Sequence, residues 1–323
     1  MKIENVKELR SAMIEDEFIS YLDIHITTRI EVLGEGFSLS GEPYYHFNLY
    51  DSTGSIRAYG QCTHWDQYSI EYGSIHSLSL QTINSQAGLT LLAFPQIGAP
   101  PTKRTSLDLL PIHQAPKVED VERLIEMATW ITIPSYKTFL LDIFCDPKFA
   151  LDFICAPASR DCHHSAPGGL LSHSLEVATY VCANATFMGM APLMTQASTI
   201  LSLIHDIGKV RLSQPDAHTL PTRDHEALIE YELSEPMNNL KRMDLDAYNI
   251  FWHLLRAYRS RMTYEAPIVG LIRAFDGCSA QNDALRKSSK RFNSRHRVKA
   301  GSRSIYMPPN ALPRKSGESL HRP

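Results

Sequence analysis

The sequence predicts a multidomain protein of mixed α and β structure: a small N-terminal β-barrel, an all-α helical domain and a basic disordered tail. Three observations predict this. The length of 323 residues favours about two domains. The spacing of apolar residues changes from a period of two, typical of strands, to a helical period after a proline-rich segment. Positive charge is concentrated at the C-terminal end. The expected boundaries are 1–95 for the barrel, 96–116 for a linker, 117–285 for the helical domain and 286–323 for the tail.

Short strands are expected in the first domain. Apolar and β-branched residues alternate in part over 19–33, and a second alternating run, 45–50, leads into a turn at Asp51–Gly54. Further strands are predicted at 55–60, 74–80 and 89–94. Five short strands suit a small barrel. A strand that ends in Asp-x-(Ser/Thr)-Gly before a strand with an outward basic residue resembles the OB-fold, a nucleic-acid-binding module.

Helices are expected after the linker. The linker is predicted because 96–116 contains Pro100, Pro101, Pro111 and Pro116. Beyond it, apolar residues recur at helical spacing from Val118 to Ala128. Further helices are predicted at 136–144, 170–188, 194–207, 225–235, 245–258 and 267–280. The second domain is therefore expected to be mainly α.

Composition and charge indicate where the protein works and which partners it could bind. No run of about 18 apolar residues is present, so no membrane partner is expected, and the polar start Met1–Glu8 favours the cytoplasm over secretion. Six scattered cysteines without a Cys-x-x-Cys pair indicate reduced thiols. The tail carries a formal charge of +10 against −13 for the rest. Such tails often bind nucleic acid, and a solvated tail without a partner is the alternative.

Potential metal ligands recur along the helical domain. A carboxylate such as Asp206, at the end of an apolar segment, is costly to bury without a cation or donor beside it. Histidine and carboxylate groups from several segments are the ligands that Zn, Mn or Fe prefer. The predicted ligands are His173, His205, Asp206, His225, His253 and Asp276. Taken singly, His225 could be a surface histidine and His253 a core histidine, and His218 could replace His225.

The order of these residues resembles the HD superfamily of metal-dependent phosphohydrolases. The resemblance rests on His173, the doublet His205-Asp206 and Asp276, and the interposed His225 and His253 resemble its two-metal members. It implies an all-α bundle over about 117–285. It also implies a first divalent ion on the four-residue set and a second on the two extra histidines. Mn, Fe, Mg, Co and Zn all remain open.

Two subfamilies are similar in more detail. Residues 157–173, with Gly168-Gly169-Leu170-Leu171-Ser172-His173, resemble the YhaM-type 3'-5' exoribonucleases, which place an OB domain before the HD domain. The same stretch, continued to Ala178, resembles the TraI-type domain of MobH conjugative relaxases. That family has three successive histidines where this chain has Cys162-His163-His164, so relaxase chemistry stays open.

The predicted function is a metal-dependent phosphodiesterase or nuclease, a 3'-5' exonuclease that attacks single-stranded RNA or DNA with metal-activated hydroxide. Lys209 is expected to contact phosphate, and His163 and His164 to donate to phosphate or the leaving group. Residues of the barrel expected to bind the strand are Arg29, Tyr45, Phe47, Arg57 and Tyr59. A relaxase-like DNA-processing component of a mobile element and a nucleotide phosphohydrolase are the alternatives, and oligomerisation is left open.

Overall fold

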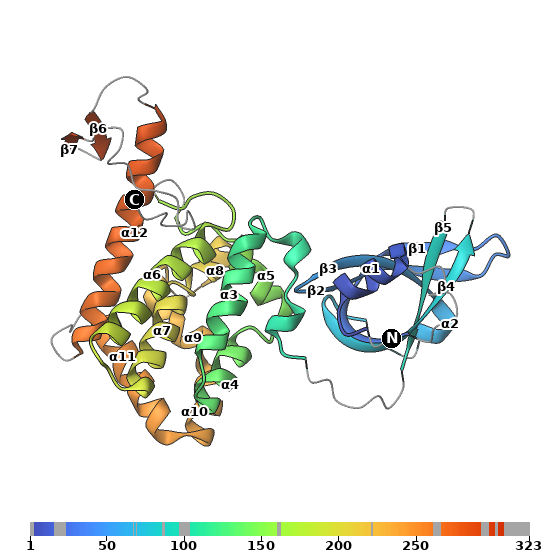
Figure 1. Ribbon diagram of the computed structural model, residues 1–323, viewed down its shortest axis with the longest axis horizontal. Helices are drawn as coiled ribbons and strands as arrows, with labels where there is room; N and C mark the ends of the chain where they lie inside the picture. Colours follow the sequence, from blue (N-terminus) through green and yellow to red (C-terminus); the bar gives the residue numbers. More distant parts are fainter. Residues whose placement is uncertain are drawn as a thin grey trace. The chain divides into compact units, whose positions relative to one another are not determined.

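The computed structural model describes the chain as two compact units. Unit 1 comprises 1–125 and 141–152, and unit 2 comprises 126–140 and 153–323. The described residues are 3–15, 24–66, 68, 70–85, 88–96, 104–159, 163–220, 222–260, 266–291, 297–300 and 303–306. The elements of both units are labelled in Figure 1.

Unit 1 contains a closed five-stranded barrel. Its elements are α1 (Val6–Glu15), β1 (Ile24–Phe37), β2 (Pro43–Asp51), β3 (Gly54–Gln61), α2 (Cys62–Trp65), β4 (Ser74–Ser85) and β5 (Gly88–Pro95). The strand order is β1-β2-β3-β5-β4, with β4 returning to β1. Neighbouring strands are antiparallel except β3 and β5, which meet in parallel at Tyr59 and Leu92. The predicted small barrel is confirmed.

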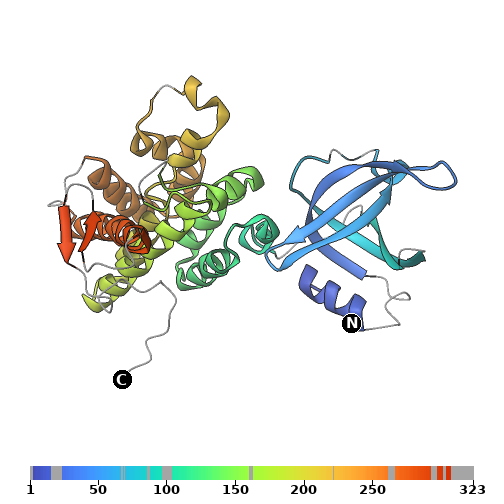
Figure 2. The same ribbon diagram turned by 90° about the horizontal axis from the view of Figure 1, so that it is seen from above.

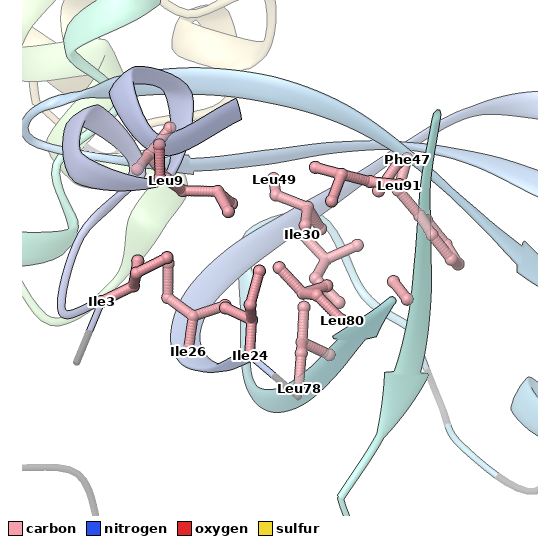
Figure 3. Packing of buried hydrophobic residues seen from close by; sticks show 14 of the residues in the cluster. Ile3, Leu9, Ile24, Ile26, Ile30, Phe47, Leu49, Leu78, Leu80 and Leu91 are labelled. Carbon is pink, nitrogen blue, oxygen red and sulfur yellow. The ribbon is translucent and has the colours of Figure 1, made fainter. Parts of the chain in front are cut away.

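Strand alternation fills the barrel with apolar side chains. Ile24, Ile26 and Ile30 of β1 point inward with Phe47 and Leu49 of β2, as Figure 3 shows. Successive strand residues face opposite sides, so the residues between them face outward. The helix α1 lies beside the barrel (Figure 2) and adds Leu9 to the same core.

Residues 104–116 belong to unit 1 rather than to a linker. They form two short 3-10 helices, η2 (Leu107–Leu109) and η3 (Ile112–Gln114), whose apolar side chains are buried. Arg104 also forms an ion pair of 2.8 Å with the buried Asp51. The expected linker at 96–116 is therefore ordered within unit 1 over 104–116, where its leucines are buried.

Unit 2 is built from helices, as predicted. The helices from α3 onward are α3 (Val118–Trp130), α4 (Pro134–Ile143), α5 (Pro147–Cys155), α6 (Gly169–Phe187), α7 (Pro192–Ile204), α8 (Lys209–Ser213), η4 (Pro215–Thr219), α9 (His225–Glu232), α10 (Ser234–Met243), α11 (Leu245–Ser260) and α12 (Pro267–Arg291). The boundary between the units falls within α3, α4 and α5. No described helix is long and apolar enough to cross a membrane.

The centre of unit 2 is the helix α6, which packs against α7 and α12. Almost every residue of its first three turns is buried. Elsewhere in the unit, the rings of Phe139 and Phe251 meet edge to face at 4.8 Å, and the Tyr136 hydroxyl donates to the carbonyl of Ala247 at 3.0 Å. These contacts hold α4 and α11 in one core.

The start of the predicted disordered tail is helical. Residues 286–291 continue α12, and β6 (Arg297–Ala300) and β7 (Arg303–Tyr306) form a hairpin beside that helix (Figure 1). The continuation has a physical reason, because Lys287 bonds to Ser165 at 2.9 Å and Arg286 lies 3.6 Å from Glu176. The rest of the tail, 292–296, 301–302 and 307–323, lies outside the described residues.

Candidate metal centre

Three segments of unit 2 bring His173, His205, Asp206 and Asp276 together. His173 lies in the first turns of α6, His205 and Asp206 follow α7 directly, and Asp276 lies on α12. A close backbone approach at the start of α6 sets the position of His173, since a Cβ on Gly169 would lie 1.8 Å from the carbonyl oxygen of His164. His173, His205 and Asp206 form a buried cluster with metal-ligand geometry.

The distances between the candidate ligand atoms fit a metal site. Nε2 of His173 lies 3.1 Å from Oδ1 of Asp276 and 3.6 Å from Oδ2 of Asp206. Nε2 of His205 lies 3.4 Å from Oδ2 of Asp206 and 3.9 Å from Oδ1 of Asp276. Tetrahedral ligands about 2.1 Å from a metal lie roughly 3.4 Å from one another. His173, His205 and Asp206 are thus spaced to share one cation, and Asp276 adjoins this set through His173.

The two histidines have their Nε2 atoms buried without a hydrogen-bond partner among the described residues. Their Nδ1 atoms do have partners. Nδ1 of His205 lies 2.7 Å from the carbonyl of Ser202, which can only accept, so this nitrogen carries the proton in the neutral ring. Nδ1 of His173 lies 3.0 Å from Oγ of Ser279. A metal ion is the partner that buried, unpaired imidazole nitrogens beside carboxylates require.

The charges at the centre keep the carboxylates ionised. Burial alone would raise the pKa of Asp206, but His205, His225 and Lys209 outweigh burial and hold the pKa well below its ordinary value. Burial also acts upward on Asp276, and its contacts with His173 and His205 lower the pKa overall. Ionised carboxylate is the form that ligates a cation.

His225 and Lys209 adjoin this centre through Asp206. Nε2 of His225 lies 3.2 Å from Oδ1 of Asp206, and Nζ of Lys209 lies 2.5 Å from Oδ2. His225 begins α9, where Asp224 caps the helix. Gly208 permits the approach, because a Cβ there would lie 2.1 Å from the carbonyl oxygen of His225. Asp206 therefore offers Oδ1 to His225 and Oδ2 to the two histidines of the buried cluster.

The structure does not bring His253 to the centre. This histidine is exposed on α11, while Leu254, Leu255 and Tyr258 of the same helix are buried. At 3.6 residues per turn, His253 and Tyr258 lie about 140° apart around the helix. Tyr258 is the residue that faces the centre, with its ring 6.0 Å from that of His205. Burial raises the pKa of Tyr258, and the nearby Asp206 and Asp276 add to this.

The two loop histidines take different positions. His163 is half-buried with its ring 5.5 Å from that of His173, and burial lowers its pKa. His164 is buried in the left-handed region, at φ +44°, and its Nε2 lies 3.1 Å from Oγ of Ser279. Its contacts are those of a residue that orders the loop, whereas His163 remains available to a substrate. Cys162, the departure from the three-histidine pattern, lies outside the described residues.

A pocket of about 570 Å³ begins at this edge of the centre. Lys209, Arg223 and His225 line it together with the apolar Pro157, Ala158 and Leu212. Such a mixture suits a ligand with an apolar ring and negative charge. Arg223 and Leu212 were not singled out from the sequence, because no motif marks them, whereas Pro157 and Ala158 belong to the 157–173 stretch.

Two of the predicted strand-binding residues of the barrel are buried in unit 1. Phe47 is fully buried in the core, where its ring lies 4.7 Å from that of Trp65. Arg29 is 3% exposed and donates to the carbonyls of Leu109, Gly73 and Cys145. Both predictions are corrected: Phe47 lies on the inward side of β2, and Arg29 satisfies backbone carbonyls that would otherwise be buried unpaired.

The other three predicted residues, Tyr45, Arg57 and Tyr59, lie on different faces of the barrel wall. Tyr45 shares the inward face with Phe47 and packs against the core. Arg57 is exposed and pairs with Asn48 in the register, and Tyr59 pairs with His46 on the same outer face. Tyr44, His46 and Tyr59 form an aromatic group with ring centroids 4.7–5.7 Å apart. A separate groove of about 550 Å³ is lined by Arg10, Leu33, Asn48, Ser55, Ile56 and Arg57.

Comparison with known protein families gives a match over part of the chain. Residues 120–267 are similar to a family, TraI_2, described as "Putative helicase". The match covers His173, His205, Asp206 and His225 and ends before Asp276. No curated protein and no solved structure matches the chain. The predicted similarity to the TraI-type region of MobH relaxases is thus confirmed over 120–267, and the resemblance to YhaM-type enzymes and to the wider HD superfamily stays a prediction.

Proposed function

We propose that this chain is a metal-dependent phosphodiesterase that cleaves single-stranded nucleic acid. One observation carries the proposal: His173, His205 and Asp206 converge at metal-ligand spacing beside Asp276, and both histidine Nε2 atoms are buried and unpaired among the described residues. A divalent cation bound there would polarise a phosphoryl oxygen and lower the pKa of a water for in-line attack.

The residues around the cation would bind and orient the phosphate. Lys209, once released from Asp206 by the cation, would supply a point charge to a phosphate oxygen. Arg223 lines the adjoining pocket and would bind the next phosphate. His163 is near enough to His173 to donate to the leaving oxygen. Oδ1 of Asp206 and Nε2 of His225 are the pair that would hold a second ion.

The barrel supports a polymeric substrate. Its groove presents Arg10 and Arg57 beside apolar Leu33 and Ile56, and the aromatic group of Tyr44, His46 and Tyr59 lies on the same strands. Charge that follows a backbone and rings that stack on bases are what single strands require. Attack from the 3' end follows from the YhaM-type resemblance and is the polarity we expect.

A second candidate is a DNA-processing component related to the MobH relaxases. The match of residues 120–267 to TraI_2 favours it. In this case the same metal centre would act on one DNA strand as part of strand processing rather than on any free end. The two candidates differ in product, since degradation gives shortened strands and strand transfer gives a protein-linked one.

The test is a cleavage assay on metal-free protein reloaded with Mn²⁺. Single-stranded RNA and DNA labelled at either end, and mononucleotides, are the substrates. We expect metal-dependent shortening that Asp206→Asn abolishes and His253→Ala, a change of an exposed histidine, leaves intact. A covalent DNA adduct would select the second candidate, and turnover of mononucleotides alone would select a nucleotide hydrolase. Equal cleavage by Asp206→Asn and wild type would overturn the metal assignment.

A further inference from the structure

Ser279 lies at the centre of a hydrogen-bond network behind the metal centre. It is a fully buried residue of α12. Its Oγ lies 2.6 Å from Oε2 of Glu176, 3.0 Å from Nδ1 of His173 and 3.1 Å from Nε2 of His164. Three buried polar groups, two from α6 and one from the loop before it, therefore meet at one hydroxyl of α12.

The hydrogen inventory of the hydroxyl fixes the direction of each bond. A serine hydroxyl has one hydrogen to donate and two lone pairs that accept. The carboxylate of Glu176 can only accept, and the short contact of 2.6 Å shows that the single hydrogen goes there. His173 and His164 must then each donate an N–H to Ser279. His173 is held as the tautomer with its proton on Nδ1.

We propose that Ser279, oriented by Glu176, is a positioning residue that presents the Nε2 lone pair of His173 to the cation. The inference rests on the metal centre of the proposed function. Outer groups that fix the tautomer and orientation of a ligating imidazole raise its affinity for the metal. His205 achieves the same result by a different route, through the carbonyl of Ser202.

Further contacts hold the network itself in place. Oε1 of Glu176 lies 3.6 Å from Nη1 of Arg286, while Oε2 accepts from Ser279. The backbone N–H of His164 donates to Asp283 at 2.6 Å. Asp276, Ser279 and Asp283 recur at intervals of three and four residues, so one face of α12 carries both the ligand and its support.

The first test measures Mn²⁺ affinity by calorimetry on the full chain. Ser279→Ala is expected to weaken binding by about 10- to 100-fold. Ser174→Ala is the matched control, because Ser174 is an equally buried serine, next to His173, whose hydroxyl has no partner among the described residues. It should bind as wild type does. Unaltered affinity in Ser279→Ala, or an equal loss in Ser174→Ala, would overturn the inference.

The second test reads the tautomer directly in metal-free protein at pH 8. The ¹⁵N spectrum of labelled histidines, with His173 assigned from its loss in His173→Asn, should show a proton on Nδ1 of His173. A proton on Nε2 would overturn the inference even if Ser279→Ala fails to fold. The readouts also separate the two proposals. Wild type that binds Mn²⁺ and keeps the Nδ1 proton but cleaves no nucleic acid would refute the proposed function alone.

Discussion

Asp206 meets His225 through Oδ1, at 3.2 Å, while its Oδ2 faces the His173 and His205 pair. A single carboxylate thus connects two groups of nitrogen ligands. The arrangement is suited to bridging two cations, and it depends on Gly208, which lets the backbone of His225 approach.

Removing the charge of Asp206 should abolish stabilisation by metal. A ligand that binds only the folded state stabilises it by about 2.7 kcal/mol at 100 times its Kd. Wild type should gain this much when Mn²⁺ is added at that level, and Asp206→Asn should gain nothing at the same concentration. Urea unfolding with and without Mn²⁺ measures the gain. The same increase in both proteins would show that the ion binds elsewhere.

His225 and His253 should differ in their effect on metal stoichiometry. His225 contacts Asp206, whereas His253 is exposed on α11. We therefore expect two Mn²⁺ ions per chain in wild type and His253→Ala, and one in His225→Ala, counted by calorimetry and elemental analysis. Loss of an ion in His253→Ala would restore the sequence-based assignment of that residue.

Acid should weaken the metal-free protein through His164. Burial lowers the pKa of His164 to about 4, below its ordinary value of 6.5. Between these values the unfolded chain binds a proton that the folded chain does not, so stability falls as pH falls from about 6.5 to 4. The slope for one such group is at most about 1.4 kcal/mol per pH unit.

The variant that tests this is His164→Asn, because asparagine tolerates the left-handed backbone at φ +44°. Urea midpoints at pH 4.5 and 7 should lie closer together in the variant than in wild type. An unchanged difference would assign the acid sensitivity to other groups.

The two arginines of the barrel should separate stability from binding. Arg29→Ala leaves the buried carbonyls of Leu109 and Gly73 without their donor, and at about 1–3 kcal/mol each the loss should be severe. Arg57→Ala removes an exposed charge and should change stability by no more than about 0.5 kcal/mol.

For the folded proteins, Arg57→Ala should reduce nucleic-acid binding more than Arg29→Ala does. Arg57→Ala should weaken single-stranded DNA binding and reduce the salt slope by about 0.7, the value for one phosphate contact. Fluorescence anisotropy across a salt series measures both quantities. Full affinity in Arg57→Ala would remove this groove from the binding surface.

Much of the fold could be predicted from local periodicity. The period of two over the strands predicted the barrel, and the apolar faces of the later segments predicted the helices. Helix α1 was missed, and α12 was predicted to end at Ala280. The polar face of α12 has no apolar period, because Ser279, Asp283 and Arg286 satisfy partners from α6 and the preceding loop.

The candidate site could be predicted where residue type and order carry the chemistry. His173, His205, Asp206 and Asp276 were identified this way, and the structure brings them together. His253 could not be excluded from the sequence, because only the packing of α11 decides which side of that helix is exposed. The same holds for Tyr258, which no motif marked.

The sequence by itself determined the two kinds of domain and the chemistry of the ligand set, because periodicity and residue type are local properties. Tertiary structure decided which side chains meet. It buried Arg29 and Phe47, turned His253 outward and placed Ser279 behind His173. These outcomes depend on contacts between residues far apart in the chain, whose hydrogen bonds and burial are fixed only when the helices and strands pack.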